Sequence, residues 1–258
     1  MLKYPDIDPI IFSLGPIQVR WYGLMYVLGF SAAYFLVNRQ IRTRNLEKWE
    51  AHFENLNFVL IISLILGARL GYALFYNFPY YSAHPSEIFA IWKGGMSFHG
   101  ALLGTIIGGV FFCLKNRLDF WQGADLYVVT VPIGLGLGRL ANFINGELFG
   151  RVSDVPWAMV FPNGGPLPRH PSQLYECFLE GVVLFVLLWF LKEKKMPSGY
   201  ILASFLILYG LFRSFVELFR QPDIQLGFVL AHVTMGQILS ICMILAGSSI
   251  IFFRKKKH

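Results

Sequence analysis

The sequence has 258 residues, of which 55% are hydrophobic and only 14% charged, and its mean hydropathy is +0.54. A soluble domain carries roughly 25% charged residues, so this composition excludes an ordinary soluble globular protein. It indicates a polytopic membrane protein, because a helix needs about 20 apolar residues to cross the hydrocarbon layer. The net charge of +7 lies in short tracts between apolar runs, which points to membrane topology and not to nucleic-acid binding.

Apolar runs predict an all-α integral membrane fold with about seven transmembrane helices. We interpret residues 1–258 as a single polytopic membrane domain. The segment between the fourth and fifth runs, residues 144–171, is rich in proline and glycine, so we expect a small irregular head on the outer side. The seven runs are Trp21–Val37, Leu56–Tyr76, Gly94–Leu114, Trp121–Phe143, Ser172–Leu191, Gly199–Phe219 and Val233–Phe253.

The distribution of lysine and arginine between the runs predicts the orientation. These residues are dense in Arg39–Lys48, Lys115–Arg117, Lys192–Lys195 and Arg254–Lys257, and sparse in the intervening connections. Positively charged loops are retained in the cytoplasm. We therefore expect the N-terminus outside and the C-terminus in the cytoplasm.

Three arginines lie inside the apolar runs, at Arg69, Arg139 and Arg213. With a rise of 1.5 Å per residue, they lie roughly 20, 27 and 21 Å from the inner ends of their runs, in the outer half of the membrane. His99 enters from the outer side and lies about 8 Å below that face. An arginine at mid-bilayer costs roughly 2.5–3.5 kcal/mol and needs a partner. Phosphate is a suitable one, because guanidinium binds it through two parallel hydrogen bonds, so the pattern points to chemistry on an anionic lipid.

Internal ion pairs are the alternative explanation for these arginines. Glu217 follows Arg213 by four residues on the same helix face, and Glu176 and Glu180 share a face near the outer end of the fifth run. For Arg69, a structural ion pair and a functional role are both open.

His99 lies in the glycine-rich segment Gly94–Gly104. A lone histidine is more often a hydrogen-bonded packing residue, but the neighbouring glycines allow another backbone or a substrate to approach closely. Gly100, Gly104 and Gly108 also form a stripe of small residues, which predicts close helix packing.

The densest polar stretch is Gly138–Gly150, where the fourth run leaves the membrane. Arg139, Asn142, Asn145 and Glu147 follow one another there. A polar helix terminus capped by asparagine side chains is the alternative to a functional site.

At these residues the sequence resembles the prolipoprotein diacylglyceryl transferase family of the bacterial cytoplasmic membrane. The stretch Gly138–Gly150 matches the family's pattern at every defined position. Supporting matches extend from the first run to the region before the last, so the resemblance covers nearly the whole chain. They are Trp21–Tyr26, Gly94–Gly104, Arg169–Glu176, Tyr209–Arg213 and Phe219–Asp223.

The resemblance implies transfer of the sn-1,2-diacylglyceryl group from phosphatidylglycerol to the lipobox cysteine thiol of a preprolipoprotein. The products are a thioether-linked lipid and glycerol 1-phosphate, in the first step of bacterial lipoprotein maturation. The implied partners are phosphatidylglycerol, the precursor's signal peptide and membrane lipid, with no nucleic acid. We expect no cofactor and no metal, because the sequence offers no cluster of metal ligands.

The resemblance also implies roles for individual residues. It implies that Arg139 and Arg213 hold the lipid headgroup and that His99 is central to catalysis; from its chemistry we expect His99 to be the general base. Tyr209, one turn from Arg213, is expected to orient that arginine or the ester. The residues implied to support the site are Tyr22, Asn142, Glu147, Gly150 and Glu217.

A membrane transporter or channel for an anionic substrate would also explain arginines inside the spans. Such a protein needs a polar lining through the inner half of the membrane as well. The polar groups lie mainly in the outer half, so the sequence favours the transferase.

Overall fold

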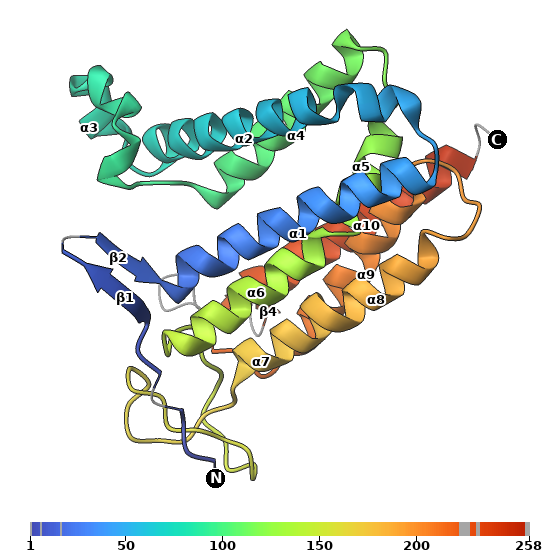
Figure 1. Ribbon diagram of the computed structural model, residues 1–258. Coiled ribbons are helices and arrows are strands. Elements are labelled where there is room, and N and C mark those ends of the chain that lie inside the picture. Colours follow the sequence, from blue (N-terminus) through green and yellow to red (C-terminus); the bar gives the residue numbers. More distant parts are fainter. Residues whose placement is uncertain (1, 6, 16, 222–227, 231–232, 256–258) are drawn as a thin grey trace. The chain divides into compact units, whose positions relative to one another are not determined.

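The structure is a computed structural model, and it describes residues 2–5, 7–15, 17–221, 228–230 and 233–255. Pro222, Asp223, Lys256 and Lys257, which belong to tracts named above, lie outside the described residues. The chain is mostly helical and divides into two compact units, Met1–Val37 with Ala124–His258 and Asn38–Gly123 (Figure 1).

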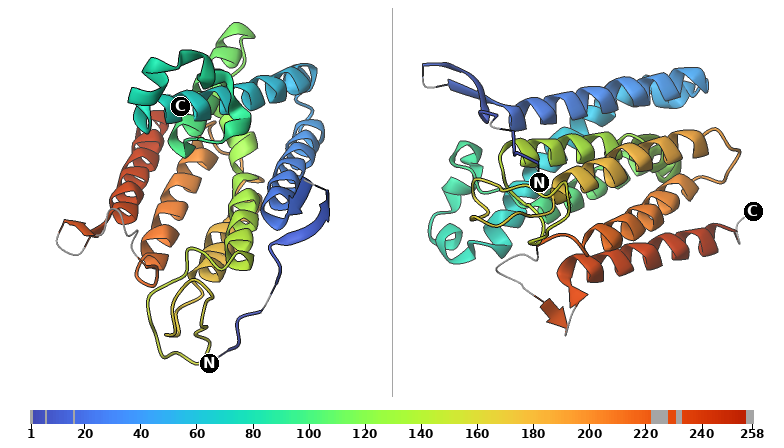
Figure 2. Two further views of the ribbon diagram at one scale, coloured as in Figure 1. Left: turned by 90° about the vertical axis from the view of Figure 1, so that its left-hand side faces the viewer. Right: turned by 90° about the horizontal axis from the view of Figure 1, so that it is seen from below.

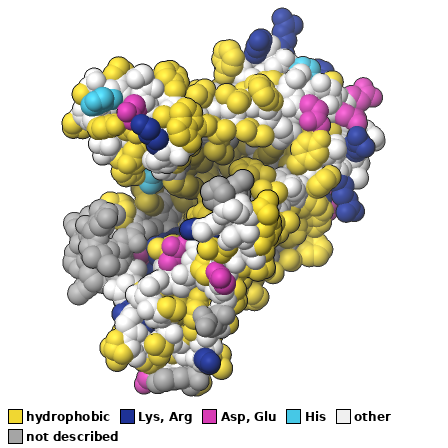
Figure 3. Space-filling model, turned by 60° about the vertical axis from the view of Figure 1, so that its left-hand side comes forward, with side chains coloured by type: hydrophobic (Ala, Val, Ile, Leu, Met, Phe, Trp, Pro, Cys, Tyr) yellow, Lys and Arg dark blue, Asp and Glu magenta, His cyan; other side chains and the backbone are white. Residues whose placement is uncertain are grey.

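Within the described residues, five helical segments are long and apolar enough to cross a membrane, which agrees with an all-α membrane protein. A sixth helix, α9 (Tyr200–Val216), is apolar but shorter. Large apolar side chains remain exposed over much of the surface, as expected of helices that face lipid (Figure 3). The five segments are Glu47–Phe75, Phe98–Lys115, Phe120–Ile144, Ser172–Leu191 and Met235–Lys255.

The unit of residues 38–123 is built on two closely packed helices, α2 (Glu47–Phe75) and α4 (Phe98–Lys115). A Cβ atom on Gly100 would lie 2.3 Å from the carbonyl oxygen of Gly67, and one on Gly104 would lie 2.3 Å from that of Ser63. The predicted packing role of the glycine stripe is therefore confirmed.

Between α2 and α4 the chain forms only short elements: α3 (Phe78–Ala83) and two 3-10 helices, Pro85–Phe89 and Ile91–Lys93. Two predicted boundaries in this unit are wrong. Helix α2 begins at Glu47 and not at Leu56, because polar residues extend it beyond the apolar run. Helix α4 begins at Phe98 and not at Gly94, because Gly94 and Gly95 have positive φ angles.

The other unit contains a hairpin, a helical bundle and a second, smaller hairpin. Strands β1 and β2 pair antiparallel and lead directly into α1, and α6 to α10 form the bundle. Helix α5 joins α6 through a turn at Val129 and Thr130, ahead of Pro132. The bounds are β1 (Ile10–Leu14), β2 (Ile17–Arg20), α1 (Trp21–Thr43), α5 (Phe120–Val128), α6 (Val131–Ile144), α7 (Ser172–Glu176), a π-helical turn (Cys177–Val183), α8 (Leu184–Leu191), β3 (Phe228–Leu230), β4 (Val233–Thr234) and α10 (Met235–Lys255).

Helices α9 and α10 run side by side (Figure 2). A Cβ atom on Gly210 would lie 2.8 Å from the Ser240 carbonyl oxygen, so the two backbones are almost in contact. At the start of α9, the carboxylate of Asp125 accepts hydrogen bonds from the backbone N–H groups of Gly199 (2.7 Å) and Leu202 (2.8 Å). Asp125 therefore caps α9 from another helix and fixes where it begins.

The segment after α6 forms turns and isolated bridges instead of helices. Arg169 bridges both Val152 and Met159, and Met159 also bridges Leu2 near the N-terminus (Figure 1). The Tyr4 hydroxyl donates to the carbonyl oxygen of Phe143 at 2.6 Å. These contacts fasten the segment and the N-terminus to the end of α6.

We predict that Gly67→Ala destabilises the protein by about 1–3 kcal/mol, because its Cβ atom would lie 2.4 Å from the Gly100 carbonyl oxygen and force α2 and α4 apart. Gly134→Ala is the matched control, since a Cβ atom there meets nothing within 4 Å. Thermal unfolding of the full chain in detergent measures both. Equal unfolding midpoints for the two variants would contradict the packing.

Candidate active site

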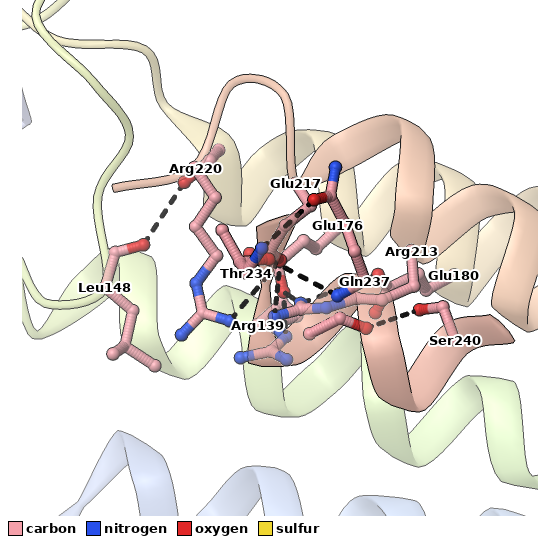
Figure 4. Close-up of polar contacts among 12 residues, drawn as sticks. Arg139, Leu148, Glu176, Glu180, Arg213, Glu217, Arg220, Thr234, Gln237 and Ser240 are labelled. Atoms are coloured by element: carbon pink, nitrogen blue, oxygen red, sulfur yellow. Dashed lines mark hydrogen bonds and ion pairs between the residues drawn. The ribbon is translucent and has the colours of Figure 1, made fainter. Parts of the chain in front are cut away.

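Two arginines from different helices form ion pairs with one carboxylate oxygen, and Arg213 also donates a hydrogen bond to it (Figure 4). Nε of Arg139, on α6, lies 2.7 Å from Oε2 of Glu176, and Nη1 of Arg213, on α9, lies 2.6 Å from the same atom. Glu176 ends α7 and is fully buried. The structure thus brings Arg139 and Arg213 together at a single acceptor.

Arg213 makes further ion pairs on its other side. Its Nη2 lies 3.0 Å from Glu217 Oε2, and its Nη1 lies 3.7 Å from Glu180 Oε1. Glu217 also accepts from the Thr234 hydroxyl at 3.1 Å and lies 4.0 Å from Nη1 of Arg220. The internal ion pairs expected as the alternative from sequence are therefore present.

The local backbone explains how two glutamates reach the same guanidinium. Glu180 lies in the π-helical turn Cys177–Val183, a wide helical turn that is often found at functional sites. A Cβ atom on Gly181 would lie 2.7 Å from the Cα of Gly136, so this turn packs directly on α6. The close approach holds the carboxylates beside the arginines.

The cluster has unused hydrogen-bond acceptors on its glutamates and unused donors on Arg139. Among the described residues, Oε1 of Glu176 and both oxygens of Glu180 accept no hydrogen bond. The side chain of Arg139 is 20% exposed, and the ion pair within the described chain uses only its Nε. Arg139 therefore keeps N–H donors for an incoming anion.

The polar stretch after α6 forms a second network around Glu147. Its Oε1 accepts from the amide nitrogens of Asn142 (2.8 Å) and Asn145 (3.2 Å), and its backbone carbonyl accepts from Gln173 (2.7 Å). Tyr22, on α1, is near enough to interact electrostatically with both Glu147 and Arg139, and its hydroxyl lies 3.3 Å from that of Tyr26. Tyr22, Asn142, Glu147 and Arg139 therefore gather at one end of the unit.

Gly150 joins three extended segments beside the cluster. Its N–H donates to the carbonyl oxygen of His170 at 2.8 Å, and it bridges Arg220. A Cβ atom on Gly150 would lie 2.5 Å from the Phe219 carbonyl oxygen, so only glycine fits. Burial lowers the pKa of the His170 imidazole.

The remaining predicted residues are Tyr209 and His99. The ring of Tyr209 stacks on Phe205, with 5.6 Å between the ring centroids, and its phenol interacts electrostatically with Arg213. His99 belongs to the other unit, where it is exposed on the first turn of α4. In the part of the chain that the structure describes, its ring makes no hydrogen bond, and no three His, Cys, Asp or Glu side chains gather to hold a metal ion.

The sequence did not single out Glu176, Glu180, Arg220 or Thr234 as site residues. The sequence did indicate the two glutamates as possible ion-pair partners of an arginine, because carboxylates inside an apolar run are rare. Arg220 and Thr234 gave no such signal. They join the cluster only through the folding of the chain after α9.

Comparison with known proteins identifies the family. The family model described as prolipoprotein diacylglyceryl transferase matches residues 9–253. The chain belongs to this family. It is 60% identical to a protein of Desulfotalea psychrophila over 256 residues, covering 97% of this chain and 94% of the relative. It is also 52% identical to a Geobacter sulfurreducens protein, with 95% of each covered, and 48% identical to one of Pseudomonas paraeruginosa, with 100% and 97% covered.

Each of these relatives is named phosphatidylglycerol–prolipoprotein diacylglyceryl transferase. The resemblance carried by Gly138–Gly150 is confirmed, and the match extends over nearly the whole chain. Family membership and the apolar helices together identify an integral protein of the bacterial inner membrane.

We predict that Glu176→Gln lowers the free energy of unfolding by about 3–5 kcal/mol, because it removes the buried charge that two arginines share. Glu50→Gln is the control, since Glu50 forms an exposed pair with Arg42 at 3.4 Å and such pairs contribute little. Thermal unfolding in detergent compares the two variants. A Glu176 variant as stable as the Glu50 variant would contradict a structural contribution from the cluster.

Proposed function

We propose that the chain transfers the sn-1,2-diacylglyceryl group of phosphatidylglycerol to the lipobox cysteine of a preprolipoprotein, and that Arg139 and Arg213 bind the phosphate of the lipid. The single observation that carries the second part is the oxygen of Glu176 shared by both guanidinium groups. Two cations that converge on one anionic oxygen can hold a phosphate oxygen in the same way. The names of the relatives support the substrates.

The reaction forms a bond between the cysteine sulfur and the terminal glycerol carbon of the diacylglyceryl group. The bond between that carbon and the phosphate oxygen breaks, and its electron pair leaves with glycerol 1-phosphate. The thiol proton passes to a base, and no oxidant or reductant is needed. The departing phosphate gains negative charge, so cations held in place beside it stabilise the transition state.

The two arginines differ in how accessible their N–H donors are to the lipid. The Nη groups of Arg139 are available from its exposed side, whereas Arg213 is buried and paired with Glu176 and Glu217. We expect the phosphate to contact Arg139 first and then to replace Oε2 of Glu176 at both arginines. Both guanidinium groups stay protonated in poorly solvated surroundings, which lysine would not guarantee.

The thiol, with a pKa of about 8.5 in water, must lose its proton to become a good nucleophile. We assign this step to His99, a residue exposed on α4. To Glu147 and Tyr22 we assign the orientation of the headgroup, and the hydrogen bonds from Asn142 and Asn145 that hold Glu147 support this role. The roles of the other residues are indirect: Glu217 and Tyr209 orient Arg213, and Gly150 keeps the chain close to Arg220.

The proposed membrane arrangement has seven spans, with the N-terminus outside and the C-terminus in the cytoplasm. The excess of lysine and arginine in the alternate connections supports this orientation. Residues 144–171 then form a small head on the outer face, where the cysteine of a translocated precursor is presented.

We predict that Arg139→Ala and Arg213→Ala each lower turnover by about 10²–10³-fold, because each removes a cation from the leaving phosphate. Release of glycerol phosphate from labelled phosphatidylglycerol is measured in proteoliposomes that contain a lipobox peptide. Arg39→Ala, which removes an exposed arginine of α1, is the control variant.

A peptide with serine in place of cysteine separates the transferase from the transporter or channel. The transferase releases no glycerol phosphate with the serine peptide, whereas a transporter would move its substrate regardless of the peptide. Intact lipid transfer by both arginine variants would overturn the phosphate site.

We predict that His99→Gln lowers kcat by about 10²–10⁴-fold, the usual contribution of a general base. The matched control is His52→Gln, because the His52 ring is bonded to the backbone of its own helix. Turnover is measured from pH 6 to pH 9. At high pH the medium deprotonates the thiol of the peptide, which should partly restore the turnover of the variant. Near-normal turnover at neutral pH would refute the assignment.

A further inference from the structure

Arg69 is the third arginine inside a span, and it is partnered differently from the other two. Within the described part of the chain, its guanidinium on α2 donates to five backbone carbonyl groups and to no carboxylate. Nε binds the carbonyl oxygen of Ile88 at 2.7 Å, and Nη2 binds those of Glu87 at 2.7 Å and Ala90 at 3.1 Å. Nη1 binds those of Gly94 and, at 3.2 Å, Gly95.

These contacts use the full capacity of the side chain. A guanidinium has five N–H donors, and Arg69 makes five hydrogen bonds. Arg69 is also buried, with the ring of Tyr81 5.1 Å from its central carbon. In the described structure Arg69 therefore has no N–H donor left for a phosphate, in contrast to Arg139. The structural ion pair that the sequence left open for Arg69 is not found among the described residues either.

The backbone that Arg69 holds is irregular. Residues 87–95 include the end of the 3-10 helix Pro85–Phe89 and the whole of the 3-10 helix Ile91–Lys93. The carbonyl groups of Glu87 and Ala90 accept there from the N–H groups of Ala90 and Lys93, and Arg69 adds a second hydrogen bond to each. Gly94 and Gly95 have φ angles of +78° and +76°, which favour glycine and let both carbonyls face Nη1. An arginine supplies all these donors in one rigid plane, whereas a lysine has three on a flexible stem.

The same segment leads straight to His99. The N–H of Ser97 donates to the carbonyl oxygen of Ala68, the neighbour of Arg69, at 2.9 Å. The Ser97 hydroxyl then accepts from the N–H of Gly100 at 3.1 Å and caps α4. Two consecutive residues of α2 thus fix the chain on the approach to the first turn of α4, where His99 lies.

We propose that Arg69 is a positioning residue for the transfer reaction: by binding the carbonyls of residues 87–95, it holds the first turn of α4 so that His99 faces the substrate thiol. The proposal rests on the proposed role of His99. Arg69 acts through the backbone and does not touch the lipid. Its loss should lower the rate of the chemical step and leave phosphatidylglycerol binding to Arg139 and Arg213 unchanged.

The test compares Arg69→Gln and Arg69→Lys with Lys93→Gln, which removes an exposed charge from the same segment. The full-length variants are assayed in proteoliposomes with phosphatidylglycerol and a lipobox peptide. We expect Arg69→Gln to lower kcat by about 10–100-fold, because small misplacements of a catalytic group are costly. Its KM for phosphatidylglycerol should stay within about threefold, since no headgroup contact is lost. Arg69→Lys should fall between Arg69→Gln and the unaltered protein.

Backbone hydrogen exchange provides the readout that does not depend on catalysis. Exchange in residues 94–101 should rise about tenfold or more in Arg69→Gln and stay unchanged in Lys93→Gln, while the middle of α2 keeps its protection. A rise in KM with unchanged kcat would show that Arg69 binds the lipid, and would overturn the proposal. Unchanged exchange in residues 94–101 would overturn it as well. Normal turnover of His99→Gln would instead contradict the proposed base, and the exchange measurement would still report the Arg69 contact by itself.

Discussion

A charged side chain inside an apolar span must find its partners within the protein, and the arginines of this chain meet that requirement in two ways. Arg69 is saturated by five backbone carbonyls, whereas Arg139 and Arg213 share the carboxylate oxygen of Glu176. Carbonyls that belong to the local chain cannot leave, but a carboxylate oxygen can be replaced by another anionic oxygen. The first arrangement fixes the backbone around Arg69, and we propose that the second takes up a ligand.

The glutamates around Arg213 explain how the site is kept ready without its substrate. Three arginines, Arg139, Arg213 and Arg220, lie against Glu176, Glu180 and Glu217, so the buried charges are balanced. Without those carboxylates the uncompensated charges would be costly in a poorly solvated site. Because the arginines are already oriented, the reaction that we propose needs little reorganisation when the phosphate of the lipid becomes the leaving group.

The sequence predicted the all-α membrane character, because a membrane imposes a length and an apolar composition that can be counted directly. It did not predict where α2 and α4 begin, at Glu47 and Phe98, because polar and glycine residues there do not follow the apolar runs. It predicted the pairing of Arg213 with Glu217, which depends only on a spacing of four residues. It did not predict that Glu176 is shared, because that contact needs α6, α7 and α9 to meet in space. The partners of Arg69 could not be predicted either, because they are backbone carbonyl groups. Every residue has one, so the sequence does not indicate which of them bind Arg69.

We propose that phosphatidylglycerol replaces the carboxylate of Glu176 at Arg139 and Arg213. This exchange can be observed in an experimental structure of the full chain with a non-hydrolysable phosphonate analogue of phosphatidylglycerol. We expect a phosphonate oxygen within hydrogen-bonding distance of both guanidinium groups, with Glu176 Oε2 displaced and Arg69 still bound to its carbonyls. A phosphonate bound elsewhere, with both arginines still paired to Glu176, would contradict it.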